Sequence, residues 1–500
     1  MRRRIATTDG TRLTPAFAAI RAEEQVPETF PAAVLAEAEA AARAPHVPAE
    51  DLTHIPFVTL DPPGSMDLDQ AFHLEQLPQR AGARERGGPG GGFRVRYAIA
   101  DVAAFVAPGG ALDAEANSRV VTIYCPDRRV TLYPPVLSEG AASLLPDGPR
   151  PAVVWTVDID ADGLTTAIDV RRALVRSRAK LDYPGVQAAI DADRAEGPVA
   201  LLRDVGETLI AAEHARGGMS MRVPAQEVAA DADGRLALRF RRPLPAEDWN
   251  AQLSLLTGRA AASLMLDARI GILRTLPAAD PRDVARLRRV AAGLDIAWPT
   301  DVAYGALVTV MDADTPARAA FLNEAASLFR GAGYTAFRGS LPELTTHAAI
   351  AAPYAHCTAP LRRLVDRAVS ETCLAIAAGR PVPGDIEAAL PLLAATMAEG
   401  TRRAGRVERA SIDLVEAAVL APHVGELFDA MVVALDDDGD GGEIALPELA
   451  VVARCAGRLP LGHRTQVLLD AADPATRTLR FRLASDVAPT AGSAVPGAGG

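Results

Sequence analysis

Three carboxylates stand close together directly after an apolar segment. Asp61, Asp67 and Asp69 fall within nine positions, and Pro62-Pro63-Gly64 between them favours a turn that folds Asp61 back toward the other two. Asp67 and Asp69 are two residues apart, so they share a face if the backbone is extended. Converging oxygen ligands of this kind suit Mg²⁺ or Mn²⁺, ions that serve phosphoryl transfer. From spacing alone, a solvated acidic loop is the alternative, because Asp-rich turns are common.

Arginine and histidine side chains form a second candidate group late in the chain. Arg362 follows Pro360 near a predicted helix start, where its planar guanidinium can bind a phosphate. A surface arginine is the alternative, because Lys180 is the only lysine among the 52 basic residues and arginine is therefore the chain's default basic residue. Arg363 fits either a substrate path or ion pairs with acids. His356 fits a hydrogen-bonding role better than a metal-ligand role, since no second His or Cys is near it except Cys357.

The elements that must position these residues follow from the hydrophobic pattern. Strands are predicted over 55–60, 93–100, 120–124 and 152–159. Helical patterns cover 31–43, 184–213, 248–273, 320–330, 361–378 and 385–423. The last part alternates again over 428–434, 465–469 and 477–483, which suits a small barrel of the OB type. The acidic segment then follows a strand, and Arg362 stands at the start of a helix.

Composition bounds the class of protein. With 500 residues, of which 49% are hydrophobic, the chain can bury a large core. It has four cysteines far apart and without a CxxC pair, which favours reduced thiols over zinc ligands or disulfides. No signal peptide or membrane-spanning segment is apparent, so we expect a cytoplasmic protein. The net charge of −11 neither supports nor excludes a nucleic-acid partner, because a substrate responds to the local field.

The acidic segment resembles a known family signature. Thr59–Ala71 is similar to the acidic motif of the RNB catalytic domain of the ribonuclease II and ribonuclease R family, in which two spaced aspartates precede Asp-Asp-Ala. Three of the four family aspartates are matched, and Gln70 stands at the fourth position. An amide can coordinate through its carbonyl oxygen but brings no charge. Further segments resemble the family in the same order, at 98–102, 122–126, 137–144, 177–183 and 354–367.

The resemblance implies a function and a role for each candidate residue. It implies a 3′-to-5′ hydrolytic exoribonuclease that degrades single-stranded RNA to nucleoside 5′-monophosphates with Mg²⁺, or with Mn²⁺. No nucleotide cofactor and no membrane are implied, and we expect a monomer. The implied metal ligands are Asp61, Asp67, Asp69 and Gln70; the catalytic residues are Asp69 and Arg362; the substrate-binding residues are Tyr124, His356 and Arg363. Tyr124 would otherwise be a core or rim residue of an apolar strand.

The resemblance also implies the fold and the domains. We expect an α+β protein in which an RNB catalytic domain, a mixed sheet surrounded by helices, is joined to an OB-like barrel. The predicted regions are a helical segment at 1–50, the catalytic domain at 51–424, the barrel at 425–486 and a disordered tail at 487–500. The chain is predicted to be a short form without the N-terminal cold-shock domains of full-length relatives, so its affinity for long RNA should be lower.

Two further features leave alternatives open. Family members carry a glutamate-rich helix where this chain has 248–256, and Asn250, Gln252 or Ser254 could take the place of the glutamate. Together with Gln70, this makes a catalytically weak protein that binds RNA 3′ ends the second hypothesis, and a scaffold without an RNA role the third. Asp436–Gly441 begins like a calcium loop, but Pro447 stands where such loops need Glu, so an acidic hairpin turn is favoured.

Overall fold

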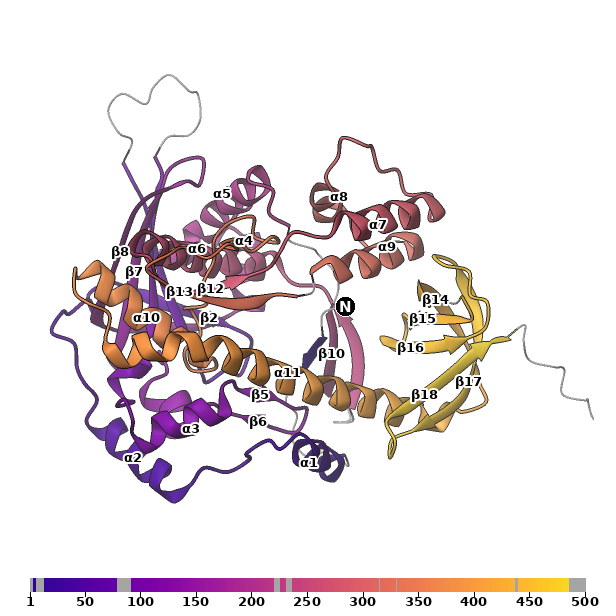
Figure 1. Ribbon diagram of the computed structural model, residues 1–500, viewed down its shortest axis with the longest axis horizontal. Helices are drawn as coiled ribbons and strands as arrows, with labels where there is room; N and C mark the ends of the chain where they lie inside the picture. Colours follow the sequence, from indigo (N-terminus) through magenta and orange to yellow (C-terminus); the bar gives the residue numbers. More distant parts are fainter. Residues whose placement is uncertain are drawn as a thin grey trace, which may run out of the picture.

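A six-stranded sheet forms the centre of the computed structural model, which describes residues 3–5, 13–78, 91–219, 225–230, 236–313, 315–329, 331–436 and 439–484 (Figure 1). Its order is β8-β7-β4-β3-β2-β9, and neighbours are antiparallel except for β2 and β9, which run parallel. The strands are β2 (Phe57–Asp61), β3 (Gln70–Gln76), β4 (Phe93–Ala100), β7 (Arg150–Ile159), β8 (Thr165–Val175) and β9 (Ser177–Asp182).

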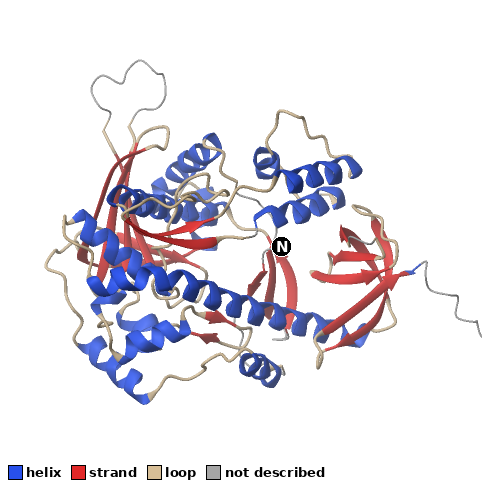
Figure 2. Ribbon diagram, in the orientation of Figure 1, coloured by secondary structure: helices blue, strands red, loops and turns tan. Residues whose placement is uncertain are grey.

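Helices cover the apolar side chains that project from the strands of this sheet. Trp155 on β7 and Tyr97 on β4 pair across the strands and are almost fully inaccessible to solvent. The long helix α6 (Pro245–Ala268) packs on these two strands, with α5 (Leu202–Ala215) and α10 (Leu364–Ala377) against it. Burial of so much apolar area is the main force that holds these helices on the sheet. Figure 2 shows the helices gathered around the strands.

A second body of β structure lies at the far end of one long helix. Helix α11 (Gly384–Leu420) runs from the region of α10 to the C-terminal strands (Figure 1). There the strands close into a five-stranded barrel of order β14-β15-β16-β18-β17. They are β14 (Leu427–Leu435), β15 (Gly441–Leu446), β16 (Val451–Ala456), β17 (Arg464–Asp473) and β18 (Thr478–Leu483). The predicted fold class, α+β with an OB-like barrel at the C-terminal side, is confirmed.

Smaller elements complete the molecule. They are β1 (Arg3–Ile5), α1 (Thr14–Glu23), α2 (Ala32–Arg43), α3 (Ala111–Arg119), β5 (Ile123–Tyr124), β6 (Arg129–Val130), α4 (Tyr183–Asp191), β10 (Ala225–Ala230), β11 (Leu236–Arg241), β12 (Ile270–Thr275), α7 (Pro281–Gly293), α8 (Tyr304–Val310), α9 (Pro316–Ala326) and β13 (Gly333–Arg338). The segment 1–50, predicted to be helical, contains helices α1 and α2. It also contains strand β1, which joins β10 and β11 in a three-stranded sheet. Helix α9 packs against barrel strand β14.

Some predicted boundaries were wrong for local reasons. The helix predicted over 248–273 ends at Ala268, because Arg269 adopts a left-handed conformation with φ of 55° and the chain then enters β12. The suspected calcium loop connects antiparallel strands β14 and β15, which confirms a hairpin; its residues 437–438 lie outside the described residues. The predicted tail at 487–500 also lies outside them. None of the four cysteines forms a disulfide and all are buried. Among the described helices, none combines the length and apolar character needed to cross a bilayer.

Candidate active site

The acidic segment is a fixed loop at the end of two neighbouring strands. β2 ends at Asp61 and its antiparallel neighbour β3 begins at Gln70, so the loop between them must return to the same end of the sheet. Its turn places Gly64 at a φ of +81°, a conformation that glycine adopts without strain. The buried Ser143 hydroxyl accepts from the Leu68 amide at 2.9 Å and donates to the Met66 carbonyl at 2.6 Å. These bonds fix the backbone on both sides of Asp67 and directly before Asp69.

A second fixed loop presents Arg362 just before helix α10. The fully buried Asp366 in the first turn of α10 accepts from the Ala359 amide at 2.7 Å and from Nε and Nη2 of Arg363 at 2.9 and 2.7 Å. The Arg362 carbonyl accepts from the Thr122 amide at 3.0 Å, which ties the loop to the segment before β5. The Arg362 side chain is 44% exposed. A rigid backbone thus holds a guanidinium that solvent can reach.

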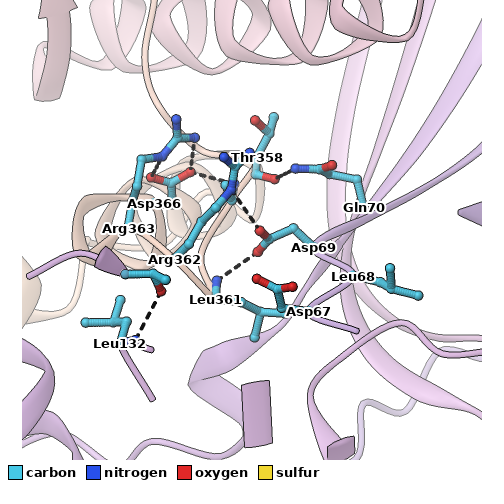
Figure 3. Close-up of polar contacts among 12 residues, drawn as sticks. Asp67, Leu68, Asp69, Gln70, Leu132, Thr358, Leu361, Arg362, Arg363 and Asp366 are labelled. Carbon is cyan, nitrogen blue, oxygen red and sulfur yellow. Dashed lines mark hydrogen bonds and ion pairs between the residues drawn. The ribbon is translucent and has the colours of Figure 1, made fainter. Parts of the chain in front are cut away.

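The two loops meet at Asp69, although 292 residues separate Asp69 from Leu361 in sequence. Asp69 Oδ1 accepts from the Leu361 amide at 2.8 Å, and Asp69 Oδ2 pairs with Arg362 Nε at 3.2 Å (Figure 3). Asp69 is only 3% exposed. This burial raises its pKa to about 7, although the positive charge of Arg362 and the Leu361 amide act in the opposite direction. The site therefore holds a carboxylate that is costly to ionise without an added positive charge.

Asp61 lies in the same electrostatic neighbourhood and has an unused oxygen. Burial raises the pKa of Asp61 to about 6, with Arg362 opposing the shift and Asp67 adding to it. Its Oδ2 is inaccessible to solvent and has no hydrogen-bond partner. A buried acceptor of this kind, beside further carboxylates, fits a hard divalent cation. In the part of the chain that the structure describes, no three Asp, Glu, His or Cys side chains are grouped tightly enough to form a ready metal cage.

Two of the predicted ligands already have partners in the protein. Asp67 Oδ1 pairs with Arg129 Nη1 at 2.6 Å, and Arg129 Nη2 also binds Glu139 Oε1 at 3.0 Å. The Gln70 amide nitrogen donates to the Thr358 carbonyl, on the opposite side of Asp69 from Asp67 in Figure 3. Arg129 thus engages Asp67, the Leu361 amide and Arg362 engage Asp69, and the Thr358 carbonyl engages Gln70, so three of the four predicted ligands have partners within the protein.

The predicted substrate-binding residues have different surroundings. Tyr124 on β5 is 36% exposed, and desolvation together with the charges of Asp67 and Asp69 raises its pKa to about 12, against the effect of Arg362. His356 Nδ1 shares a 2.7 Å hydrogen bond with the Tyr334 hydroxyl. Burial lowers the pKa of His356, with help from nearby arginines, so it is neutral. Arg363 is held by Asp366. Tyr124 alone of the three presents an open surface beside the carboxylates.

The structure separates the three candidates for the missing glutamate. Ser254 Oγ lies 2.7 Å from Thr358 Oγ1 and so adjoins the residue that Gln70 contacts. Asn250 bonds to the Tyr183 hydroxyl at 3.1 Å, whereas Gln252 binds Glu213. Ser254 is the one that reaches the Gln70 side of the site.

Sequence reasoning missed Arg129 and Glu139. The signal available for Arg129 was an Arg-Arg pair that begins four residues after Tyr124, and its second member pairs across the β5–β6 hairpin with Tyr124. Recognising that pairing requires knowledge of the hairpin, whose strands are two residues long.

Comparison with known proteins gives a consistent picture. Residues 49–376 match the model of the RNB domain, and residues 426–484 match the RNase II-type exonuclease C-terminal S1 domain. The human exosome complex exonuclease RRP44 is 26% identical over 346 residues, which is 66% of this chain but only 34% of RRP44. The Mycoplasma genitalium RNase R, solved with ribose-methylated single-stranded RNA, superposes with a TM-score of 0.80 at 19% identity, covering 94% of this chain and 77% of that chain.

The fold also occurs in a protein described as a pseudonuclease. Yeast Ssd1 superposes with a TM-score of 0.64 at 15% identity, over 87% of this chain and 54% of Ssd1. The fold alone therefore does not decide whether a chain cleaves RNA. The RNB model nevertheless matches more than half of the chain, with its S1 partner domain following it, and the chain belongs to the RNB family of ribonuclease II and ribonuclease R relatives.

Proposed function

We propose that this protein is a divalent-metal-dependent exoribonuclease that removes nucleotides from the 3′ end of single-stranded RNA and releases nucleoside 5′-monophosphates. The observation that carries the proposal is the meeting of Arg362 with Asp69. A guanidinium open to solvent stands directly beside buried carboxylates whose ionisation needs added positive charge. Metal-assisted phosphodiester hydrolysis uses this combination, a cationic group for the phosphate next to oxygen ligands for a metal ion.

Each residue has a role in the proposed reaction. Asp61, Asp67 and Asp69 would hold the cation, and Gln70 could add only its carbonyl oxygen. A bound divalent ion supplies charge neutralisation at the phosphate and lowers the pKa of a water molecule. Arg362 engages Asp69 through Nε, and no described residue accepts a hydrogen bond from its Nη groups, which are therefore available to phosphate oxygens.

The end of the RNA would be recognised next to these charges. Tyr124 offers a partly exposed aromatic ring for stacking on the terminal base. Arg363 acts mainly by positioning, because its ion pair with Asp366 holds the loop that carries Arg362. Contact of His356 or Arg363 with the substrate stays a prediction, as do the cytoplasmic location and the monomeric state.

A direct assay tests the proposal. A 5′-labelled single-stranded RNA should shrink stepwise from its 3′ end with Mg²⁺ or Mn²⁺, and the reaction should stop with EDTA or with Asp69→Asn. A circular RNA of the same sequence should survive, because it has no end. Cleavage of the circle would point to an endonuclease instead, and activity that persists in EDTA would reject the role of the metal.

The second candidate function is a protein that binds RNA 3′ ends without degrading them. It is favoured by the uncharged Gln70 and by the arginine on Asp67, both of which reduce the negative charge available to metal ions. Linear RNA that stays intact with Mg²⁺ and Mn²⁺, yet forms a complex at low salt, would select this function over hydrolysis.

A further inference from the structure

Arg129 occupies a position that the proposed reaction does not explain. It lies on the two-residue strand β6, opposite Tyr124, and its side chain is 24% exposed. One nitrogen, Nη1, binds Asp67 Oδ1 at 2.6 Å, and the other, Nη2, binds Glu139 Oε1 at 3.0 Å. Because two acids hold the guanidinium from two sides, it is fixed in the acidic site instead of extending into solvent.

The charges around the site are nearly balanced before a metal ion is added. The site has three carboxylates, those of Asp61, Asp67 and Asp69, and two guanidinium groups. Arg129 pairs with Asp67, and Arg362 pairs with Asp69. Gln70 contributes no charge, and its nitrogen is bonded to Thr358. One divalent ion can be accommodated by the remaining negative charge, including that of Glu139. A second would stand close to Arg129 with no carboxylate left to offset the repulsion.

We propose that Arg129 is a built-in cation that holds Asp67, so that the acidic site binds one divalent ion and excludes a second. The inference rests on the proposed metal-dependent function and specifies its metal requirement. Asp61 retains a buried oxygen without a partner, so it is the carboxylate most available to that ion. Arg129 acts here as a positioning residue, because it contacts Asp67 and has no described contact of its own with the reacting groups.

Counting bound ions tests the inference without reference to RNA cleavage. Equilibrium dialysis with Mn²⁺ should give one ion per wild-type chain. Arg129→Gln should bind a second ion, with an affinity raised by on the order of a hundredfold once the guanidinium repulsion is removed. Arg128→Gln is the matched control: it makes the same charge change at the next residue, whose side chain is 52% exposed and pairs with Glu28 away from Asp67. It should bind one ion, as should Arg129→Lys, which keeps the charge.

Two results would overturn the inference. One is a wild-type protein that binds two ions or none; the other is an Arg129→Gln protein that binds the same number as Arg128→Gln. If Arg129→Gln does not fold, anomalous scattering from a Mn²⁺-soaked crystal of the wild-type protein decides instead. A single peak with Arg129 still on Asp67 supports the inference, whereas two peaks or a displaced Arg129 reject it. RNA ladders are scored separately, so a correct ion count without cleavage would reject only the proposed nuclease activity.

Discussion

Without metal, the protein should lose stability as the pH rises from 5 to 8, and Asp69 should be the main cause. Asp69 is 3% exposed, and this burial raises its pKa to about 7 from the ordinary value of 3.8 for an aspartate. When folding raises the pKa of an acid, the protonated acid contributes to the unfolding free energy. That contribution is fully present below the pKa of the unfolded chain and is lost as the pH rises through the pKa of the folded protein. Between pH 5 and pH 7 the folded protein keeps this buried group mostly protonated, whereas the unfolded chain has already released the proton, so rising pH favours the unfolded chain.

The expected loss follows from the size of the shift. About two pKa units separate pH 5 from the pKa of Asp69, which corresponds to a loss on the order of 3 kcal/mol of unfolding free energy. Asp61, with its pKa raised to about 6, adds a smaller loss of the same sign. Addition of Mg²⁺ at pH 8 should restore stability, by about 2.7 kcal/mol at a hundred times the dissociation constant.

Urea denaturation in EDTA at several pH values measures this effect. Asp69→Asn cannot ionise, so the difference in unfolding free energy between wild type and variant should move against the wild type as the pH rises. The measured quantity is the slope of this free-energy difference against pH. A constant difference in stability caused by the substitution therefore does not affect the result. Parallel curves for the two proteins between pH 5 and pH 8 would refute the conclusion that Asp69 is held in an unfavourable charged state.

Three further predictions concern the residues around the carboxylates. Ser143→Ala should lower the unfolding free energy by about 1–3 kcal/mol and slow RNA cleavage, because the acidic loop loses its two hydrogen bonds to the hydroxyl. The control Ser138→Ala removes a hydroxyl that bonds outside that loop, so it should lower the urea midpoint and leave the cleavage rate unchanged. Asp366→Asn should destabilise by about 3 kcal/mol, because Arg363 loses its buried counterion, and a melting point within a degree of wild type would contradict this. Tyr124→Leu should weaken binding of a short RNA by about 1–3 kcal/mol in fluorescence anisotropy while Tyr124→Phe should not; equal losses would argue against stacking.

Much of the site could be predicted because its parts are local in sequence. A strand that ends at Asp61, a turn, and the start of the next strand at Gln70 bring the loop back by geometry that hydrophobic alternation and Pro-Pro-Gly already indicate. The position of Arg362 just before a helix was equally local. These segments needed only the right element type at the right boundary.

The contacts that decide the charge of the site could not be predicted. Arg129 reaches Asp67 through a hairpin of two-residue strands, which leaves no hydrophobic period to read. Strands β2 and β9 pair in parallel although the other four strands of the sheet lie between them in sequence. No tight turn connects the two strands, so no local sequence signal marks their pairing. Ser254, Thr358 and Gln70 adjoin one another through tertiary packing of α6 against the Arg362 loop. In each case the partner is chosen by the assembled fold and not by nearby sequence.

The long separation between Asp69 and its partners has a consequence during synthesis. The chain leaves the ribosome from its N-terminus, so the acidic loop emerges 292 residues before Leu361. At typical elongation rates of about 5–20 residues per second, the loop waits roughly 15–60 s for the segment that completes it. During that time Asp69 lacks the amide and the guanidinium that fix it. A nascent or truncated chain that ends before Leu361 therefore cannot carry the assembled centre.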